Sequence, residues 1–282
     1  MNVNALTDSA VGIVVFDIDG VIRDVTGSHF RAMSDTVESL TNGCYRPTQE
    51  SIDILLAEGN WNNDYEASRE LILRFHESQG VPRVEVNLDM QLLVDLFEQR
   101  YWGDELLKKD GYVEGVIDGY IDEEFLLIKR GYFDRLTQAG VLWGFFTGAT
   151  RHSAKYVLED RLGLTVPALF AVEDGPGKPD PTGLLEVVRQ LETLNKIERP
   201  LNVIFAGDTV ADQKTIGRVK ELDLSRNWIG VGILPPHVHQ VSEQNKIYKD
   251  ALRQAGASEI LLSIQDFNLE RIRFWLDNGR SM

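Results

Sequence analysis

The sequence predicts an α/β fold, a doubly wound parallel sheet into which an all-helical domain is inserted. An apolar run at residues 11–16 has the β-branched and aromatic composition of a strand that helices cover on both faces. After Gly140, strand-like apolar runs alternate with helical patterns, as expected of a parallel sheet. Between these two regions, residues 28–107 show only helical periodicity.

The helical region separates into four expected helices. They cover residues 28–40, 48–57, 64–78 and 87–101, with Thr48 as a candidate N-cap. A segment rich in glycine and acidic residues follows at 111–124, and a further helix is expected at 123–138. We therefore expect residues 1–27 and 125–282 to form the core domain, and residues 28–124 to form a helical cap.

The alternation after Gly140 supplies the rest of the predicted sheet. Strands are expected at 141–148, 168–173, 201–208 and 228–234. Helices are expected around residues 156–162 and at 181–194, 212–222, 242–254 and 269–278. Because ligands of such sheets bind at the carboxyl ends of the strands, the polar residues at those ends are the candidate site.

Composition and charge exclude several classes of function. The chain has 282 residues, 43% of them hydrophobic, which is enough for a sizeable core. A formal net charge of -15 argues against nucleic acid or an anionic membrane as a partner, although a phosphorylated small molecule can still bind through local groups. The single cysteine, Cys44, excludes an internal disulfide framework.

The beginning of the chain has neither the basic nor the apolar region of a signal peptide. No window approaches the roughly 20 apolar residues that span a bilayer. We therefore expect a cytoplasmic protein, and the sequence leaves its oligomeric state open.

Two carboxylates, Asp17 and Asp19, follow the first strand and precede Gly20. The period-two geometry of a strand sends both to the same side. Two like charges so close repel unless a cation lies between them, and oxygen ligands of this kind favour Mg²⁺. The alternative is an ordinary Asp-Gly turn with an additional acidic residue.

Three later strand ends or loops carry further polar residues. Thr147 and Gly148 end the second long strand, Lys178 lies in a Gly-Lys-Pro loop, and Asp208 ends another strand four positions before Asp212. Phosphoryl transfer needs a nucleophilic carboxylate, a cation to spread charge, and donors for the phosphoryl oxygens. Taken singly, Thr147 could be a turn residue, Lys178 a solvated charge and Asp208 a helix N-cap.

The sequence resembles the haloacid dehalogenase superfamily in four ordered motifs. They are Asp17-Ile-Asp19-Gly-Val21, the strand FFTG with Thr147, GKPDP with Lys178, and Gly207-Asp208-Thr-Val-Ala-Asp212. The similarity covers about residues 11–30 and 125–240, and the insert of about 90 residues resembles the helical C1 cap of subfamily I. The phosphoglycolate phosphatase and β-phosphoglucomutase branch is the most similar.

This resemblance implies the chemistry of the first strand end. Asp17 would be the nucleophile that forms an aspartyl-phosphate. Asp19 would protonate the leaving oxygen and then activate water. An acid at position 19 distinguishes phosphatases and mutases from dehalogenases, because a halide needs no proton.

The resemblance also implies how phosphate and metal are held. Thr147 and the Gly148 amide would bind phosphoryl oxygens, and Lys178 would neutralise the nucleophile and the phosphate. Asp208 would hold Mg²⁺ beside Asp17 and the backbone carbonyl of Asp19. Asp212 would be a metal ligand or lie just behind the ligands.

We therefore expect a Mg²⁺-dependent phosphatase that acts on a small phosphorylated metabolite. The alternative is a phosphomutase of the β-phosphoglucomutase type, which passes the same phosphoryl group to a second hydroxyl of a sugar phosphate. A regulatory homologue without catalytic activity is a third alternative, but every chemical position of the motifs is present.

The cap would choose the substrate. In the loop 59–64, Asn62 and Asn63 are candidate substrate-binding residues, and Arg23 is a third candidate just after the catalytic strand. The alternative for the loop is structural, because Asn and Gly populate turns, Asp64 can cap a helix, and Trp61 can pack between helices.

Overall fold

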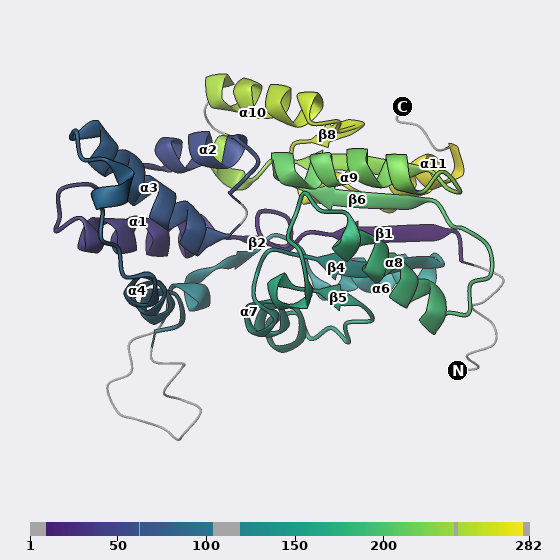
Figure 1. The fold of residues 1–282 in the computed structure, drawn as a ribbon. Coiled ribbons are helices and arrows are strands. Elements are labelled where there is room, and N and C mark those ends of the chain that lie inside the picture. Colours follow the sequence, from purple (N-terminus) through teal and green to yellow (C-terminus); the bar gives the residue numbers. More distant parts are fainter. Residues whose placement is uncertain (1–9, 62, 104–118, 240–241, 279–282) are drawn as a thin grey trace. The chain divides into compact units, whose positions relative to one another are not determined.

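The computed structural model describes residues 10–61, 63–103, 119–239 and 242–278. The chain divides into two compact units, one made of Met1–Asp24 and Leu126–Met282 and the other of Val25–Phe125 (Figure 1). The division falls after Asp24 and before Leu126, whereas the sequence analysis placed it after residue 27 and before residue 125.

The first unit is built on a six-stranded parallel sheet in the order β5-β4-β1-β6-β7-β8. The strands are β1 (Gly12–Phe16), β4 (Val141–Phe146), β5 (Leu169–Phe170), β6 (Val203–Gly207), β7 (Trp228–Ile233) and β8 (Glu259–Leu261). The predicted fold class is therefore confirmed. Strand β8 was not expected, because three residues are too few to give a periodic signal.

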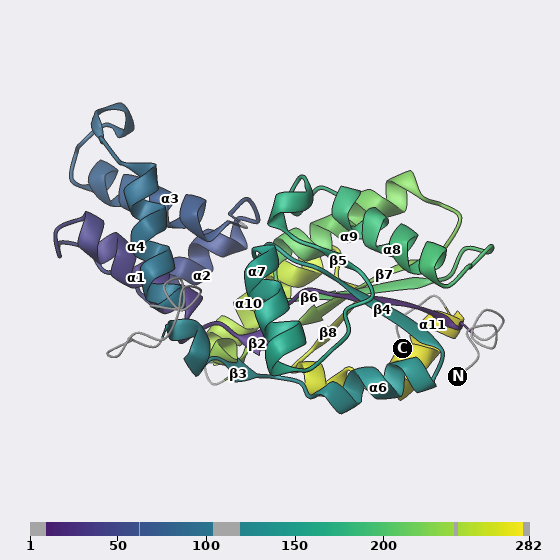
Figure 2. The ribbon, with the colours of Figure 1, turned by 90° about the horizontal axis from the view of Figure 1, so that it is seen from below.

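Helices cover both faces of the sheet (Figure 2). Alternate residues of β1 supply the two cores: Val14 and Phe16 pack with one set of helices, and Ile13 and Val15 with the other. The first set comprises α6 (Arg130–Gln138), α7 (Arg151–Lys155) with its π-helical continuation (Tyr156–Arg161), and α11 (Leu269–Asn278). The second comprises α8 (Thr182–Leu194) and α9 (Val210–Leu222), and α10 (Ser242–Gln254) packs near β8.

The helix expected at residues 123–138 is wrong in its first half. A short 3₁₀ turn (Tyr120–Glu123) is followed by β3 (Phe125–Leu126), which pairs with β2 (Arg23–Asp24) in a two-stranded sheet. The Leu127 amide donates to the Ile22 carbonyl at 2.8 Å, so this stretch is extended and α6 begins only at Arg130. Local periodicity does not register this pairing because its partner lies about 100 residues earlier in the chain.

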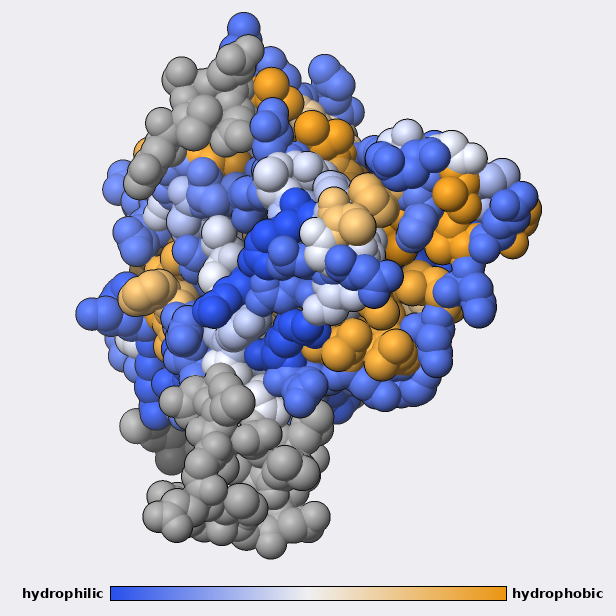
Figure 3. All heavy atoms as spheres, turned by 90° about the vertical axis from the view of Figure 1, so that its left-hand side faces the viewer, coloured by the Kyte–Doolittle hydropathy of each residue, from blue (hydrophilic) through white to orange (hydrophobic). Residues whose placement is uncertain are grey.

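The second unit is helical. It contains α1 (His29–Leu40), α2 (Gln49–Ala57), α3 (Asp64–Ser78), the turn Arg83–Glu85 and α4 (Met90–Trp102). Helix α1 packs against both α3 and α4, and the Thr48 hydroxyl caps α2 by accepting from the Ser51 amide, as predicted. The surface of this unit that Figure 3 presents is mainly hydrophilic, with hydrophobic side chains in separate groups. Across the described parts of both units, none of the helices has the length and apolar character needed to cross a membrane.

Candidate active site

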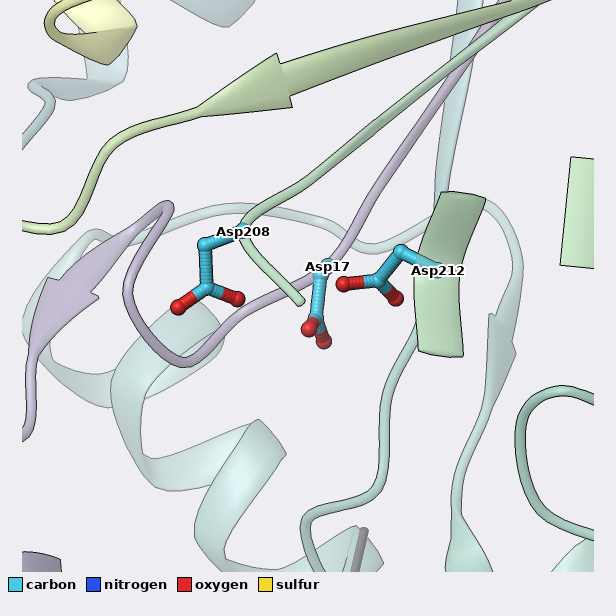
Figure 4. A group of neighbouring side chains, drawn as sticks. All are labelled: Asp17, Asp208 and Asp212. Carbon is cyan, nitrogen blue, oxygen red and sulfur yellow. The ribbon is translucent and has the colours of Figure 1, made fainter. Parts of the chain in front are cut away.

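The sheet places Asp17 and Asp208 side by side at the carboxyl ends of two neighbouring strands. Strands β1 and β6 pair in parallel with Phe16 opposite Ala206, and the Asp17 amide donates to the Ala206 carbonyl at 2.9 Å. Each aspartate is the first residue after its strand. Asp212 joins them from the first turn of α9 (Figure 4).

These three aspartates form a buried acidic cluster. Asp17, Asp208 and Asp212 are 5%, 8% and 0% exposed, and one carboxylate oxygen from each lies within 4.8 Å of the others. Like charges at this separation repel strongly when water is excluded. The cluster therefore requires compensating positive charge.

Lys178 supplies one such charge. Its Nζ lies 2.8 Å from Oδ2 of Asp17 and 2.6 Å from Oδ1 of Asp212, and its side chain is 1% exposed. The ammonium group also lies over the rings of Phe146 and Phe205, at 5.3 and 5.4 Å from their centroids. Lys178 thus contacts two of the three buried carboxylates.

Both oxygens of Asp212 are engaged by neighbouring groups. Oδ1 contacts Lys178, and Oδ2 accepts from the amide and the hydroxyl of Thr209 at 2.9 and 2.6 Å. The Thr209 hydroxyl in turn accepts from the Asp212 amide at 3.2 Å, so the pair caps the start of α9. This geometry directs Asp212 toward Lys178 and the helix rather than toward open space.

Burial and crowding raise the pKa of two of these carboxyl groups, Asp17 and Asp208. Burial raises the pKa of Asp17 to about 7 even though Lys178 opposes the rise, and repulsion from Asp212 adds to it. Burial also raises the pKa of Asp208 well above its usual range, and the charge of Asp17 reinforces the effect. Burial alone would lower the pKa of Lys178, but the carboxylates of Asp17 and Asp212 raise it above its usual value.

The donor set fits a hard divalent cation. Oδ1 of Asp208 is buried and has no hydrogen-bond partner among the described residues, and the Asp208 carboxylate belongs to the same cluster as Asp17. An unpaired buried carboxylate oxygen is costly unless something compensates it. The buried carboxylates outnumber the nearby cation, so the cluster can accept further positive charge. Their donor atoms are all oxygens, which Mg²⁺ and similar ions prefer as ligands.

Asp19 lies on the loop between β1 and β2, paired with Arg23. Nε of Arg23 donates to Oδ1 of Asp19 at 2.6 Å, and Nη2 of Arg23 donates to Oγ of Ser153 at 2.9 Å. Arg23 is 0% exposed, which differs from the substrate-facing position expected for it. The contact with Ser153 leaves no local pattern in the sequence, because 130 residues separate Ser153 from Arg23.

Gly20 makes this loop compatible with the acidic cluster. It has a φ of +71°, and a Cβ built on it would lie 2.0 Å from Oδ2 of Asp208. A larger residue at position 20 would therefore meet both backbone strain and a collision with the Asp208 carboxylate.

Thr147 and Gly148 lie at the same edge of the sheet, directly after β4. Thr147 is buried, and its amide donates to the Phe170 carbonyl at 3.0 Å. Its hydroxyl accepts from the Ala149 amide at 3.1 Å, which fixes the turn that leads into α7. The structure thus brings Asp17, Asp19, Thr147, Gly148, Lys178, Asp208 and Asp212 to the strand ends of one unit.

Two candidate substrate residues, Asn62 and Asn63, belong to the helical unit. Oδ1 of Asn63 accepts from the amides of Tyr65 and Glu66, so Asn63 is the N-cap of α3. Asp64, which the structural alternative for this loop gave as a helix cap, pairs with the ring of His29. Asn62 lies outside the described residues.

A doubly wound sheet with buried carboxylates and a lysine near its strand ends has the architecture of an α/β enzyme. The chain belongs to the haloacid dehalogenase-like hydrolase family, whose model matches residues 11–218.

Comparison with individual proteins agrees with this membership at the level of the fold. A phosphatase, Tt82 from Thermococcus thioreducens, is 22% identical and superposes with a TM-score of 0.58 over 86% of this chain and 99% of its own. A phosphonoacetaldehyde hydrolase-like protein from Oleispira antarctica is 17% identical, with a TM-score of 0.62 over 98% and 97% of the two chains.

A curated relative in sequence is an imidazoleglycerol-phosphate dehydratase from Phytophthora nicotianae. It is 26% identical over 258 residues, which are 90% of this chain and 50% of that protein. The chain therefore spans about half the length of this relative.

Proposed function

We propose that the protein is a Mg²⁺-dependent phosphatase that hydrolyses the phosphomonoester of a small metabolite through an aspartyl-phosphate. The observation that carries this proposal is the buried Asp17 carboxylate, held by Lys178 and set beside Asp208 at the strand ends. A carboxylate held in this way can attack phosphorus, while the neighbouring charges stabilise the transition state.

Both oxygens of Asp17 have partners that orient the carboxylate. Oδ1 accepts from the Ile18 amide at 2.7 Å, and Oδ2 lies 2.8 Å from Nζ of Lys178. In the first step, one of these oxygens forms a bond to phosphorus. The bond between phosphorus and the leaving oxygen breaks, and its electron pair goes to that oxygen.

Asp19 would supply the proton in this step. The proton of its carboxyl group moves to the leaving oxygen, and the resulting carboxylate then takes a proton from the water that attacks the aspartyl-phosphate. The bond between phosphorus and the Asp17 oxygen breaks, which restores the Asp17 carboxylate and releases inorganic phosphate. Thr147 and the Gly148 amide would hold phosphoryl oxygens during both steps, which accords with their position beside β1.

We assign the Mg²⁺ ligands to Asp17, Asp208 and the backbone carbonyl of Asp19. When bound, the ion neutralises negative charge on the carboxylates and the phosphoryl group. Asp212 was also expected near the metal, but its two oxygens are engaged by Lys178 and Thr209. We therefore propose that Asp212 positions Lys178 instead of binding the metal directly.

The substrate panel should include several classes of leaving group. Phosphate esters of glycolate, a sugar, glycerol and a nucleoside cover the classes that the site chemistry permits. The curated relative is named after a phosphomonoester that carries an imidazole ring, imidazoleglycerol phosphate. Imidazoleglycerol phosphate therefore belongs in the panel as well.

The test is phosphate release from this panel with and without Mg²⁺, with the Asp17→Asn variant measured in parallel. We expect metal-dependent release that the variant loses while keeping its fold, because the substitution is nearly isosteric. Asp134→Asn, at a side chain that is 55% exposed on α6, is the matched control and should retain activity. Retained release in Asp17→Asn would contradict the nucleophile assignment.

A negative panel result would favour the alternative activity. Without phosphate release from any ester, conversion of β-glucose 1-phosphate that depends on glucose 1,6-bisphosphate would identify a phosphomutase. If the wild-type protein shows neither phosphatase nor phosphomutase activity, that result contradicts the proposal that this site transfers phosphoryl groups.

A further inference from the structure

Arg23 is a buried cation whose hydrogen bonds lead to the proposed proton donor. Its side chain is 0% exposed, while the side chain of Asp19 is 27% exposed. A guanidinium group stays charged in proteins, and burying it is costly unless its donors are well used. Its burial beside Asp19 therefore needs an explanation beyond an ordinary surface ion pair.

The loop that carries Asp19 brings Arg23 back onto it. The amides of Val21, Ile22 and Arg23 all donate to the Ile18 carbonyl, and the Gly20 amide donates to the Arg23 carbonyl at 2.9 Å. These bonds make a tight turn in which Asp19 and Arg23 face each other as an isolated β-bridge. The pairing of the two side chains thus follows from the backbone of this loop.

The second donor of Arg23 ties the loop to α7. Nη2 of Arg23 reaches Oγ of Ser153, which is 2% exposed, and the amide of Ser153 donates to the capping hydroxyl of Thr150 at 3.3 Å. Helix α7 begins three residues after the candidate phosphate-binding residue Gly148. Because the fork of an arginine has fixed geometry, these two contacts together restrict where Oδ1 of Asp19 can lie.

We propose that Arg23 is a positioning residue, which holds the Asp19 carboxyl so that its proton reaches the oxygen of the leaving group. This inference rests on the proposed function. The reaction is the first step described above: Asp17 bonds to phosphorus, the ester bond breaks, and the Asp19 proton moves to the departing oxygen. Arg23 itself neither gives nor takes a proton, and it acts through its contact with Asp19.

The dependence of the rate on the leaving group isolates this role. An alkoxide needs the proton of Asp19 to depart, whereas 4-nitrophenolate departs without one. The value of kcat/KM reports only the steps up to loss of the leaving group, so the later hydrolysis of the aspartyl-phosphate does not obscure it. Glycerol 3-phosphate and 4-nitrophenyl phosphate are the two esters to compare, in the presence of Mg²⁺.

In Arg23→Lys and Arg23→Met we expect kcat/KM for glycerol 3-phosphate to fall about tenfold or more, because general acid catalysis contributes ~10²–10⁴-fold. For 4-nitrophenyl phosphate we expect a fall of less than about threefold, since no proton is needed there. Ser153→Ala should shift the ratio in the same direction but less. If Arg23→Met does not fold, the lysine variant, which keeps the charge but loses the fork, still gives the comparison.

Two controls separate positioning from general stability. Arg226→Lys changes a partly buried arginine whose side chain is 11% exposed and pairs with Glu192 and Asp223 ahead of β7, and it should leave the ratio of the two esters unchanged. In an Asp19→Asn background, Arg23→Lys should alter the ratio no further, because the group that it positions is already gone.

An equal fall for both esters, no fall for either, or an additive effect in the double variant would overturn the inference while leaving the proposed function intact. Wild-type protein that releases phosphate from neither these esters nor the panel would instead overturn the proposed function, and the inference with it.

Discussion

The ammonium group of Lys178 lies 2.8 Å from Oδ2 of Asp17, and both side chains are buried at the end of β1. Asp212 holds the other side of the ammonium group, and its second oxygen caps α9. The position of the proposed nucleophile is therefore linked to the start of a helix through a single lysine. This chain of contacts connects the stability of the fold to the chemistry of the site.

Replacing Lys178 should lower both the stability of the fold and the activity of the site. In Lys178→Met, buried carboxylates lose their cation, and we expect a loss of about 3–5 kcal/mol in the free energy of unfolding without metal. We also expect at least a tenfold loss of phosphate release. Denaturant unfolding and phosphate assays check this, with Lys155→Met on the surface of α7 as the control, expected within ~0.5 kcal/mol of wild type. Unchanged stability in Lys178→Met would contradict the charge-compensation argument.

The acidic cluster predicts a dependence of stability on pH and on Mg²⁺. The pKa of Asp17, raised from 3.8 to about 7, and the raised pKa of Asp208 mean that the folded state binds more protons than the unfolded state in this range. The contribution of these groups to stability is therefore present at acidic pH and is lost as pH rises through the folded pKa. Added Mg²⁺ should raise the melting temperature more at pH 8 than at pH 5, because protons compete with the metal.

Asp208→Asn tests the same cluster by removing one charge. The metal-free variant should gain melting temperature relative to wild type, and the gain should grow with rising pH because the wild-type carboxylate is then more ionised. The variant should also lose most of the stabilisation by Mg²⁺. Asp134→Asn is the control, and an equal response of Asp208→Asn and wild type to Mg²⁺ would rule out Asp208 as a ligand.

Alanine substitutions at Gly20 and Gly217 should have opposite effects on stability. Gly20→Ala places a Cβ 2.0 Å from Oδ2 of Asp208 at a φ of +71°, so we expect lower stability and at least a tenfold loss of phosphate release. Gly217→Ala, within α9, meets nothing within 4 Å and should stabilise the protein by about 0.5–1 kcal/mol. Thermal unfolding and phosphate release measured on both variants check the contrast. Normal activity in Gly20→Ala would show that the loop can move aside.

Asn63 predicts a structural effect in the helical unit. Asn63→Ala removes the N-cap of α3 and should cost about 1 kcal/mol of stability, whereas Asn63→Asp should keep it. Denaturant unfolding measures the cost, and KM measured alongside distinguishes the alternative. A raised KM with unchanged stability would instead support the substrate-binding role expected from the sequence.

The periodicity of apolar residues along short segments explains which parts of the fold could be predicted from the sequence. The strand at residues 11–16 and the alternation after Gly140 were sufficient to predict the parallel sheet, because apolar periodicity reflects which faces are buried. The same periodicity failed at residues 123–129, where a pairing with β2 replaces the expected helix. It also gave no sign of β8, which is too short to show a period.

The candidate site likewise has features that the local sequence predicts and features that depend on contacts distant in sequence. The sequence by itself determined which residues stand at the strand ends, because three of the four motifs directly follow an apolar run and parallel strands share one edge. Only the tertiary structure decided their partners: Asp212 with Lys178, Arg23 with Asp19 and Ser153, and Asn63 with the start of α3. The physical reason is that local composition and spacing determine the strands and helices. The partner of a buried charge depends instead on which side chain, distant in sequence, packs into the same buried site.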